Sequence, residues 1–542
     1  MLPALLISAL PGLGSAAMVP IAGDPIATTG GQLAGTRLAN GVNAYLGVPF
    51  AAPPTGDRRW APPQPIRWDG VFNADRKGPA CMQVLRPHDI NHYFGEEPTS
   101  EDCLYMNIWT PGDARPGAGL PVVVFIYGGG YTIGSSGLAN YGGENVARRG
   151  AVFVNFNYRV GAMGFMAHPE LTRAQGGHSG NYGLMDQQLA LEWVRDNIAR
   201  FGGDPAKVII MGQSAGAGSV AAQMFNPMAK GLFRGAVMSS GCNFTGDGMT
   251  LADAEALGLK MQQALGSDSL AAMRNVPADR ILAQQAESQL GLTTQGLRFG
   301  GPIIDGYLYP APHAELLARG ALNAVPIIAG YNSDDIAFNN PLSQASTGEQ
   351  YRSLAQQMYG GDANEFLRLF PLQSQAQARD TAKAVALLAG FELNARTCAR
   401  YQESVTGQPA YLYRYAHKHP YVPGVKLADQ DPATVGAYHT ADIPFWFDTL
   451  DAYNSLRPTR NWTAADRTLT DVMVNSLLNF AATGNPATEQ LAWPAWNANR
   501  EQRLEIGQTA STVTMPSRQL DWLQTHPAAA VALPPRPVGP RD

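Results

Sequence analysis

The fold is decided by the stretch Lys207-Val208-Ile209-Ile210-Met211-Gly212-Gln213-Ser214-Ala215-Gly216. Its first half is a short apolar run that predicts a buried strand, and the residues after it begin a helix. Between them lies the pattern G-x-S-x-G. A serine on so tight a strand-to-helix turn is held out at the edge of the sheet, and the two glycines remove side chains that would collide there. This context predicts a nucleophilic Ser214, with the backbone N–H of Ala215 directed at a developing oxyanion.

Similar apolar runs recur along the chain and predict further buried strands, at residues 121–127, 151–157, 235–239 and 325–330. The clearest of the helix-like stretches between them covers residues 182–201 and stops at Gly202-Gly203. Strands that alternate with helices predict an α/β fold, with a large, mostly parallel central sheet and helices on both faces. Residues 251–297 are also helix-like, and we expect them to form a cap insertion.

The predicted strand at residues 121–127 ends in three glycines, Gly128-Gly129-Gly130. Successive glycines after a buried strand let backbone N–H groups approach a substrate oxygen closely. The pattern is of the H-G-G-G type, with Tyr127 in place of the histidine. A plain glycine-rich turn is the alternative, but the serine motif favours an oxyanion loop.

A nucleophilic serine needs a general base, and nine histidines compete for that role. His439 stands just before a dense aromatic run, as expected of a loop residue held over a core. It also satisfies the chain order serine, acid, histidine that is typical of this arrangement. His417 and His419 form an H-x-H pair without an apparent third metal ligand, and we expect them in a surface loop.

The acid should follow a strand downstream of the serine. Residues 325–330 are such a strand, and Asp334 and Asp335 follow it, so both are candidates by spacing. Asp305, after another short apolar run, is a weaker third candidate. Spacing alone does not choose between Asp334 and Asp335.

Composition limits the classes of partner. The chain has 542 residues, 45% hydrophobic and 15% charged, with a formal net charge of -5. No block of like charges stands out, which argues against nucleic acid, and no stretch is typical of a membrane-spanning helix. We predict a signal peptide or disordered leader at residues 1–22, a single domain at 23–526 and a disordered Pro/Ala-rich tail at 527–542.

The cellular compartment is predicted from the N-terminus and the cysteines. Residues 1–23 carry no charge and contain an apolar run followed by small residues, which favours a secretory signal and a secreted or periplasmic protein. A bridge between Cys81 and Cys103 would agree with export, and would close a loop of about 23 residues. The alternative is a cytoplasmic protein with four free thiols.

Several further motifs occur in the same order as in a known family, and the chain resembles the type-B carboxylesterases, the group that includes the cholinesterases. The resemblance covers roughly residues 30–507 and implies the α/β-hydrolase fold. It rests on the serine motif, the glycine loop and Gly47-Val48-Pro49-Phe50-Ala51-Ala52-Pro53-Pro54, Glu101-Asp102-Cys103-Leu104-Tyr105-Met106-Asn107, Asn157-Tyr158-Arg159-Val160-Gly161, Gly183-Leu184-Met185-Asp186-Gln187, Phe201-Gly202-Gly203-Asp204-Pro205, residues 439–447 and Gly484-Asn485-Pro486.

The resemblance implies more than the residues alone. It places the acid at Asp335, where the family usually has Glu, and the oxyanion hole at the N–H groups of Gly129, Gly130 and Ala215. It supports the Cys81–Cys103 bridge. It also implies two buried ion pairs, Arg59 with Glu101 and Arg159 with Asp186. Cys242 and Cys398 match no family bridge.

Departures from the family indicate the substrate. Gln213 stands where the family usually has Glu, and Tyr93 lies near the position of the tryptophan that cradles choline in cholinesterases. Phe299, before Gly300-Gly301, resembles an acyl-pocket segment with little other bulk. We therefore expect Gln213, Tyr93 and Phe299 to line a substrate pocket that prefers neutral esters, because cation–π binding is poorly supported.

The sequence thus predicts a carboxylic-ester hydrolase that acts on a small molecule through an acyl-enzyme intermediate. The same Ser-His-Asp chemistry would serve a carbamate, thioester or amide hydrolase, and these alternatives stay open. A non-catalytic, adhesion-type relative is disfavoured because all three residues are present. No metal or organic cofactor is implied.

Overall fold

The apolar run that precedes Ser214 forms β11 (Gly203–Gln213), the central strand of the main sheet. The computed structural model describes residues 19–531, except 86, 96, 247, 286–295, 337–339 and 373. Most of the predicted leader, and the predicted tail from residue 532, lie outside the described residues. The boundaries of the predicted single domain therefore stay a prediction.

Within the described residues, eleven strands form the main sheet in the order β18-β17-β16-β15-β12-β11-β9-β10-β8-β4-β3. Their bounds are β3 Thr36–Arg37, β4 Asn43–Pro49, β8 Tyr105–Thr110, β9 Leu120–Ile126, β10 Val152–Phe156, β12 Gly235–Ser239, β15 Ile327–Asn332, β16 Ala410–Tyr415, β17 Gln502–Ile506 and β18 Ala510–Thr514. The strands from β10 to β17 pair in parallel, and antiparallel strands flank them on both edges.

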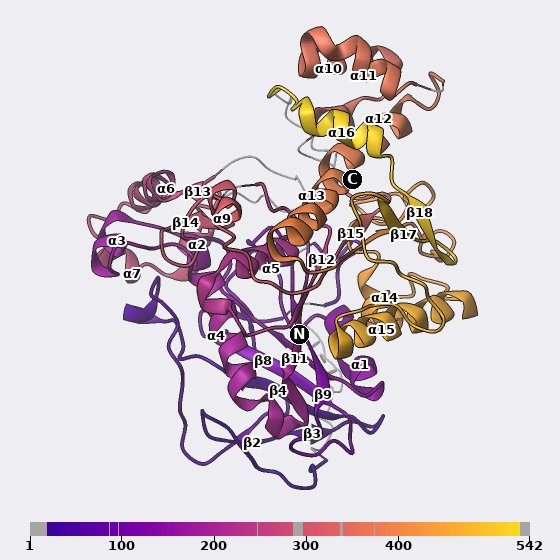
Figure 1. The fold of residues 1–542 in the computed structure, drawn as a ribbon. Coiled ribbons are helices and arrows are strands. Elements are labelled where there is room, and N and C mark those ends of the chain that lie inside the picture. Colours follow the sequence, from indigo (N-terminus) through magenta and orange to yellow (C-terminus); the bar gives the residue numbers. More distant parts are fainter. Residues whose placement is uncertain are drawn as a thin grey trace, which may run out of the picture.

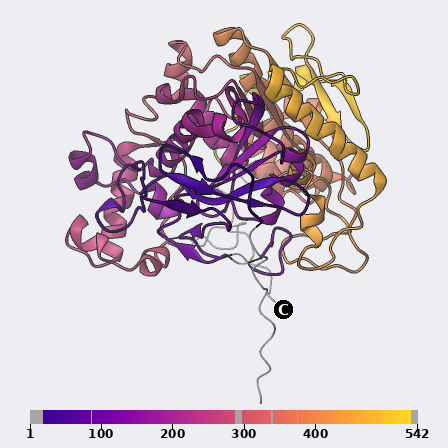
Figure 2. The same ribbon diagram turned by 90° about the horizontal axis from the view of Figure 1, so that it is seen from below.

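Helices cover both faces of this sheet, as predicted. Figures 1 and 2 show α4 (Tyr182–Asn197) and α5 (Ala215–Phe225) on one face, with α1 (Glu144–Arg148) and α15 (Ala464–Thr483) on the other. The central strands carry continuous apolar runs because both of their faces are buried. The predicted helix at residues 182–201 is confirmed, with a last 3₁₀ turn that ends at a left-handed Gly202.

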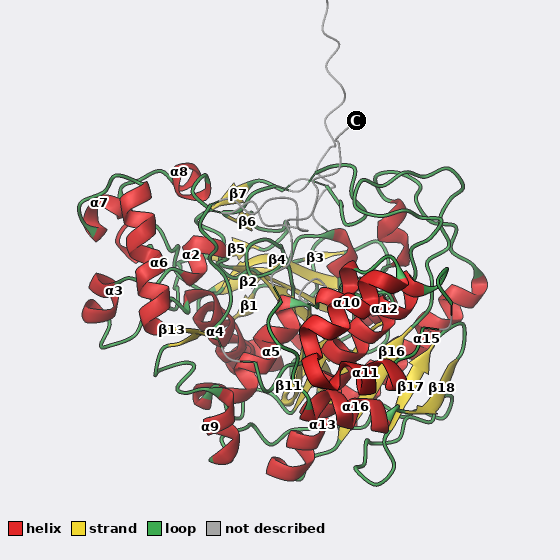
Figure 3. Cartoon of the chain, turned by 90° about the horizontal axis from the view of Figure 1, so that it is seen from above, coloured by secondary structure: helices red, strands yellow, loops and turns green. Residues whose placement is uncertain are grey.

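Two groups of helices lie outside these layers. The first contains α6 (Leu251–Ala264), α7 (Leu270–Arg274) and α8 (Ala278–Leu282), so the predicted cap is helical in its described part. The second contains α10 (Gly348–Tyr359), α11 (Ala363–Leu369), α12 (Ala378–Leu387) and α16 (Ser517–Thr525) (Figures 1 and 3). This second group has its own apolar cluster, which includes Phe366 and Trp522. No sequence pattern indicated this group.

Both ion pairs implied by the resemblance are present. Arg59 binds Glu101 through two nitrogens, with Nε–Oε2 at 2.7 Å. Arg159 Nε and Nη2 bind the two carboxylate oxygens of Asp186 at 2.9 and 2.8 Å, and only 3% and 0% of these side chains are exposed. The Arg159–Asp186 pair ties the loop after β10 to α4.

We expect Asp186→Asn to lower the free energy of unfolding by about 3–5 kcal/mol, because it leaves the buried Arg159 without a counter-charge. Urea unfolding followed by tryptophan fluorescence measures the change. The matched control is Asp196→Asn. Its partner Arg195 is 50% exposed, so losing this surface ion pair should lower the free energy of unfolding by less than about 1 kcal/mol. Equal losses in the two variants would contradict the prediction.

The four cysteines form two disulfides. Cys81 and Cys103 are bridged, with their Cα atoms 5.0 Å apart. Cys242 and Cys398 form a second bridge, which joins the segment after β12 to α13 (Leu393–Tyr401) and which no sequence pattern indicated. No helix in the described part of the chain is both long and apolar enough to cross a membrane.

Candidate active site

Ser214 stands on the sharp turn between β11 and α5. Its φ of 58° and ψ of −126° lie in a strained region for a residue with a side chain. The glycines on either side are sterically required. A Cβ on Gly212 would lie 2.1 Å from the carbonyl oxygen of Gly216, and one on Gly216 would lie 2.1 Å from that of Ile126. The turn therefore has the geometry that the motif predicts.

The glycine loop after β9 lies directly against this turn. A Cβ on Gly128 would approach the carbonyl oxygen of Gln213 to 2.4 Å. Gly129 and Gly130 have φ values of 113° and 62°, which glycine adopts without strain. Among the described residues, the N–H groups of Gly129, Gly130 and Ala215 donate to no protein acceptor. All three are thus available to an oxygen atom of a bound molecule.

Asp335 follows β15, and its carboxylate is fully buried beside His439. Oδ1 lies 2.5 Å from His439 Nδ1 and accepts from the backbone N–H of Ile336 at 2.8 Å. Oδ2 accepts from Ser240 Oγ at 2.6 Å and from the N–H of Asn332 at 3.1 Å. These hydrogen bonds fix the orientation of the carboxylate toward the imidazole.

The other two acid candidates lie elsewhere. Asp334 pairs with Lys383 and accepts from the N–H of Gly436 at 2.6 Å, so its carboxylate holds the loop that leads to His439. Asp305 accepts from the N–H groups of Tyr307 and Tyr309, which is a turn contact. The structure places only Asp335 against the imidazole.

His439 lies on a loop anchored at several points. The amide nitrogen of Asn332 donates to the carbonyl oxygen of Tyr438 at 2.8 Å, and His419 Nε2 lies 2.8 Å from that of Ala441. Gln213 Nε2 lies 3.1 Å from His439 Nε2. Within the described residues Ser214 makes no hydrogen bond to His439, so Gln213 is the partner of the outer ring nitrogen in this structure.

The prediction of a surface loop for His417 and His419 is wrong. Both side chains are buried, with His417 Nε2 2.6 Å from Asp466 and His419 among aromatic rings. Burial and the cation of Arg460 hold the pKa of His419 well below its usual value. An extended chain turns alternate side chains to the same face, and the H-x-H spacing together with the neighbouring aromatic run could have indicated this.

The comparisons with known proteins agree with this geometry. The family model described as Carboxylesterase family matches residues 23–522. The Fumonisin B1 esterase of Sphingopyxis macrogoltabida is 35% identical over 85% of this chain and 82% of its own. The Para-nitrobenzyl esterase of Bacillus subtilis (strain 168) is 32% identical over 88% and 94%. A solved PNB esterase structure superposes with a TM-score of 0.75 at 29% identity, covering 92% of this chain and 98% of that one.

The chain belongs to the carboxylesterase family. It has the α/β-hydrolase fold, and it is a carboxylic ester hydrolase. Its substrates are therefore small-molecule esters. Within the described residues of this carboxylesterase, no three His, Cys, Asp or Glu side chains gather where they could hold a metal ion.

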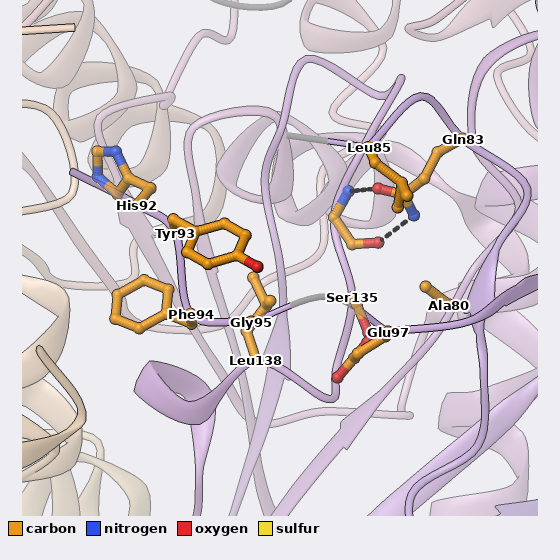
Figure 4. Close-up of a pocket in the computed structure, with 11 residues that line it drawn as sticks. Ala80, Gln83, Leu85, His92, Tyr93, Phe94, Gly95, Glu97, Ser135 and Leu138 are labelled. Carbon is orange, nitrogen blue, oxygen red and sulfur yellow. Dashed lines mark hydrogen bonds between the residues drawn. The ribbon is translucent and has the colours of Figure 1, made fainter. Parts of the chain in front are cut away.

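The structure describes the surroundings of each of the three residues predicted to line a substrate pocket. That they line one pocket stays a prediction. Gln213 is buried beside His439. Phe299 is buried in the core, and the following Gly300 lies against the carbonyl oxygen of Gly130, next to the glycine loop. Tyr93 lines a pocket that opens to solvent (Figure 4).

That pocket of the carboxylesterase is bounded by apolar and aromatic side chains, together with the polar side chains of Gln83, His92, Glu97 and Ser135 (Figure 4). Gln83 exchanges two hydrogen bonds with the backbone of Gly134, a residue just beyond the glycine loop. Burial raises the pKa of Glu97, whose carboxylate accepts from Ser135 Oγ. The charge of Lys77 acts in the opposite direction on that pKa.

Two residues of the site were missed by sequence reasoning. Ser240 donates to Asp335, and the buried Asp442 accepts from Ser239 Oγ at 2.6 Å, Tyr413 Oη at 2.8 Å and the Asn332 amide. Ser240 has a φ of 54°, unusual for a serine. A polar pair at the end of a buried strand, Ser239-Ser240, was the available signal.

Proposed function

We propose that this carboxylesterase is a serine hydrolase in which Ser214 is the nucleophile, His439 the general base and Asp335 the residue that orients the base. The observation that carries the proposal is the 2.5 Å contact between the buried Asp335 carboxylate and His439 Nδ1, beside a serine on a strained strand-to-helix turn. The carboxylate holds the proton on Nδ1, which leaves Nε2 as the acceptor for the serine proton.

The reaction proceeds in two acyl transfers. Ser214 Oγ bonds to the ester carbonyl carbon while its proton passes to His439 Nε2, and the carbonyl oxygen becomes an oxyanion. The unengaged N–H groups of Gly129, Gly130 and Ala215 supply donors for that oxyanion. The alkoxide then leaves with the proton from Nε2. A water molecule repeats the sequence on the acyl-enzyme and releases the acid.

In the enzyme without substrate, Gln213 is the residue bonded to the outer ring nitrogen of the base. With the Nδ1 proton directed at Asp335, the Gln213 amide donates to His439 Nε2 and occupies the position that the serine proton needs. Catalysis therefore requires the Ser214 hydroxyl to replace the Gln213 amide at this nitrogen. A neutral amide also leaves the imidazolium without a second adjacent negative charge.

Two measurements test the serine mechanism. p-Nitrophenyl butyrate should give a burst of p-nitrophenol equal to the enzyme concentration under conditions where deacylation limits turnover. A fluorophosphonate should label one peptide, the one that contains Ser214, in proportion to lost activity. Full inactivation with label on another residue would refute the assignment.

We also propose that neutral esters are preferred over choline esters. The segment between Cys81 and Cys103 contains no Trp, and Gln213 replaces a carboxylate near the serine. The ring of Tyr93 already packs against the tilted ring of His88, with 4.7 Å between the ring centroids. Among the described residues that line the pocket, Glu97 is the one carboxylate, and the positive charge of Lys77 lowers its pKa.

Acetylcholine should therefore gain nothing in kcat/KM over its neutral analogue, 3,3-dimethylbutyl acetate, when both are assayed at low salt. A well-placed cation–π contact would be worth about 0.5–2 kcal/mol, or up to roughly thirtyfold in affinity. The control is butyl acetate, which reports the effect of bulk alone. A tenfold or larger preference for the choline ester would overturn the proposal.

We further propose that the protein is exported to an oxidising compartment, as its leader sequence indicates. Two disulfides agree with this, because such bridges persist mainly outside the cytosol. N-terminal sequencing of protein recovered from the periplasm or medium would test it, with cleavage after Ala17 as the expected result.

A further inference from the structure

Thr440, the residue after His439, has an unusual backbone conformation. Its φ is 77°, in the left-handed region that glycine adopts readily and that a β-branched residue adopts only under strain. Such a conformation persists only where the surroundings hold it. Because Thr440 shares a peptide bond with His439, whatever holds it also sets the position of the imidazole.

The contact that holds the Thr440 side chain comes from a distant part of the chain. Thr440 Oγ1 is hydrogen-bonded to Nε2 of His92, and this is its only side-chain hydrogen bond within the described residues. The flanking carbonyl groups of Tyr438 and Ala441 are held by other partners, Asn332 and His419. The carbonyl oxygen of Thr440 accepts from the N–H of Ile443 at 3.1 Å, whereas its side chain depends on His92.

His92 is itself fixed from several sides. Its Nδ1 lies 4.0 Å from Asp429, and its ring meets that of Tyr438 edge-on at 5.6 Å. The neighbouring Asn91 donates its backbone N–H to Asp429 at 2.9 Å and accepts from the buried Arg460. The segment that carries His92 is closed at its base by the Cys81–Cys103 bridge, and Figure 4 shows His92 at one end of the row of pocket-lining residues.

We infer that His92 is a positioning residue: by holding Thr440 in its left-handed conformation, it keeps His439 aligned between Asp335 and Ser214. The inference rests on the proposed serine mechanism. Small displacements of a catalytic group are costly, since about 1 Å can lower the rate by roughly a hundredfold. The disulfide-closed segment thereby contributes to the alignment of the base, although it contains none of the three reacting side chains.

The test compares His92→Ala in two backgrounds. In the wild-type background kcat for p-nitrophenyl butyrate should fall by about thirtyfold with KM changed less than about twofold. His92→Gln, whose amide can replace Nε2, should recover most of the loss. In the Thr440→Gly background, where no strained threonine needs holding, His92→Ala should lower kcat by less than about threefold relative to Thr440→Gly alone.

Thr440→Val is the matched variant that leaves His92 and the pocket intact. It keeps the β-branched shape and removes the hydroxyl, so its kcat should fall as far as that of His92→Ala. It also tests the inference if His92→Ala fails to fold. Each rate is divided by the fraction of enzyme that a fluorophosphonate titrates, which removes the contribution of unfolded protein.

Three outcomes would overturn the inference. The first is an equal loss of kcat from His92→Ala in both backgrounds, and the second is full activity in Thr440→Val. The third is a change in KM alone, which would make His92 a substrate contact in the pocket. Failure of the serine mechanism would be distinguishable, because wild-type enzyme would then show no fluorophosphonate label on Ser214.

Discussion

Ser214→Ala is expected to lower kcat for p-nitrophenyl butyrate by at least about three orders of magnitude, while the protein stays folded. Removing the nucleophile of a Ser-His-Asp arrangement leaves only binding and oxyanion stabilisation, and losses of up to roughly 10⁶-fold are typical. The fold should tolerate the change because Ser214 Oγ makes no hydrogen bond within the described residues, and alanine adds no volume.

The measurement is kcat on purified protein, with the thermal midpoint as a control for folding. Ser455→Ala is the matched variant, since Ser455 is exposed and bonds only to a nearby carbonyl group. It should keep wild-type turnover. A Ser214→Ala enzyme that retained more than about a hundredth of wild-type kcat would show that another residue is the nucleophile.

Asp335→Asn should cost about 10⁴-fold in kcat, whereas Asp334→Asn should cost less than about tenfold. An amide at position 335 can donate to Nδ1 and so stabilise the wrong imidazole tautomer, and it cannot stabilise the imidazolium. At position 334 the amide oxygen can still accept from Gly436, and only the ion pair with the half-exposed Lys383 is lost.

These two adjacent substitutions control for each other, because they change the charge of the same loop by the same amount. Measuring kcat/KM for both from pH 5 to 9 excludes a simple shift of the pH optimum. Equal losses, or a larger loss at position 334, would refute the assignment of the acid.

Much of the fold was predictable because its signals are local. The buried strands around β11 are continuous apolar runs, and the turn at Ser214 needs glycine at 212 and 216 for steric reasons that the sequence shows directly. The predicted strand at 325–330 is displaced by two residues from β15, Ile327–Asn332, because Asn332 continues the pairing with β16. Local pattern rarely fixes the last pair of a strand.

What sequence reasoning missed depends on contacts between distant segments. The second helical group combines α10–α12 with α16, which follows more than a hundred residues later in the chain. The role of Ser240 depends on Asp335, 95 residues away, and that of His92 on Thr440, 348 residues away. Asp335 itself was chosen over Asp334 by the family resemblance, since both follow β15 at nearly the same spacing.

The Cys242–Cys398 bridge affects how freely the sequence between the two cysteines can change. It joins cysteines separated by 156 residues, and this span includes the helices α6–α8 and α10–α12 of both outer groups. In the chain-entropy model, closing a loop of this length raises the free energy of unfolding by about 5 kcal/mol, because it lowers the entropy of the unfolded chain. Within the span, insertions or even a single proteolytic cut leave the ends covalently joined, so Ser240 stays tethered to α13. The outer helices can therefore diverge in sequence while the two bridged segments stay joined.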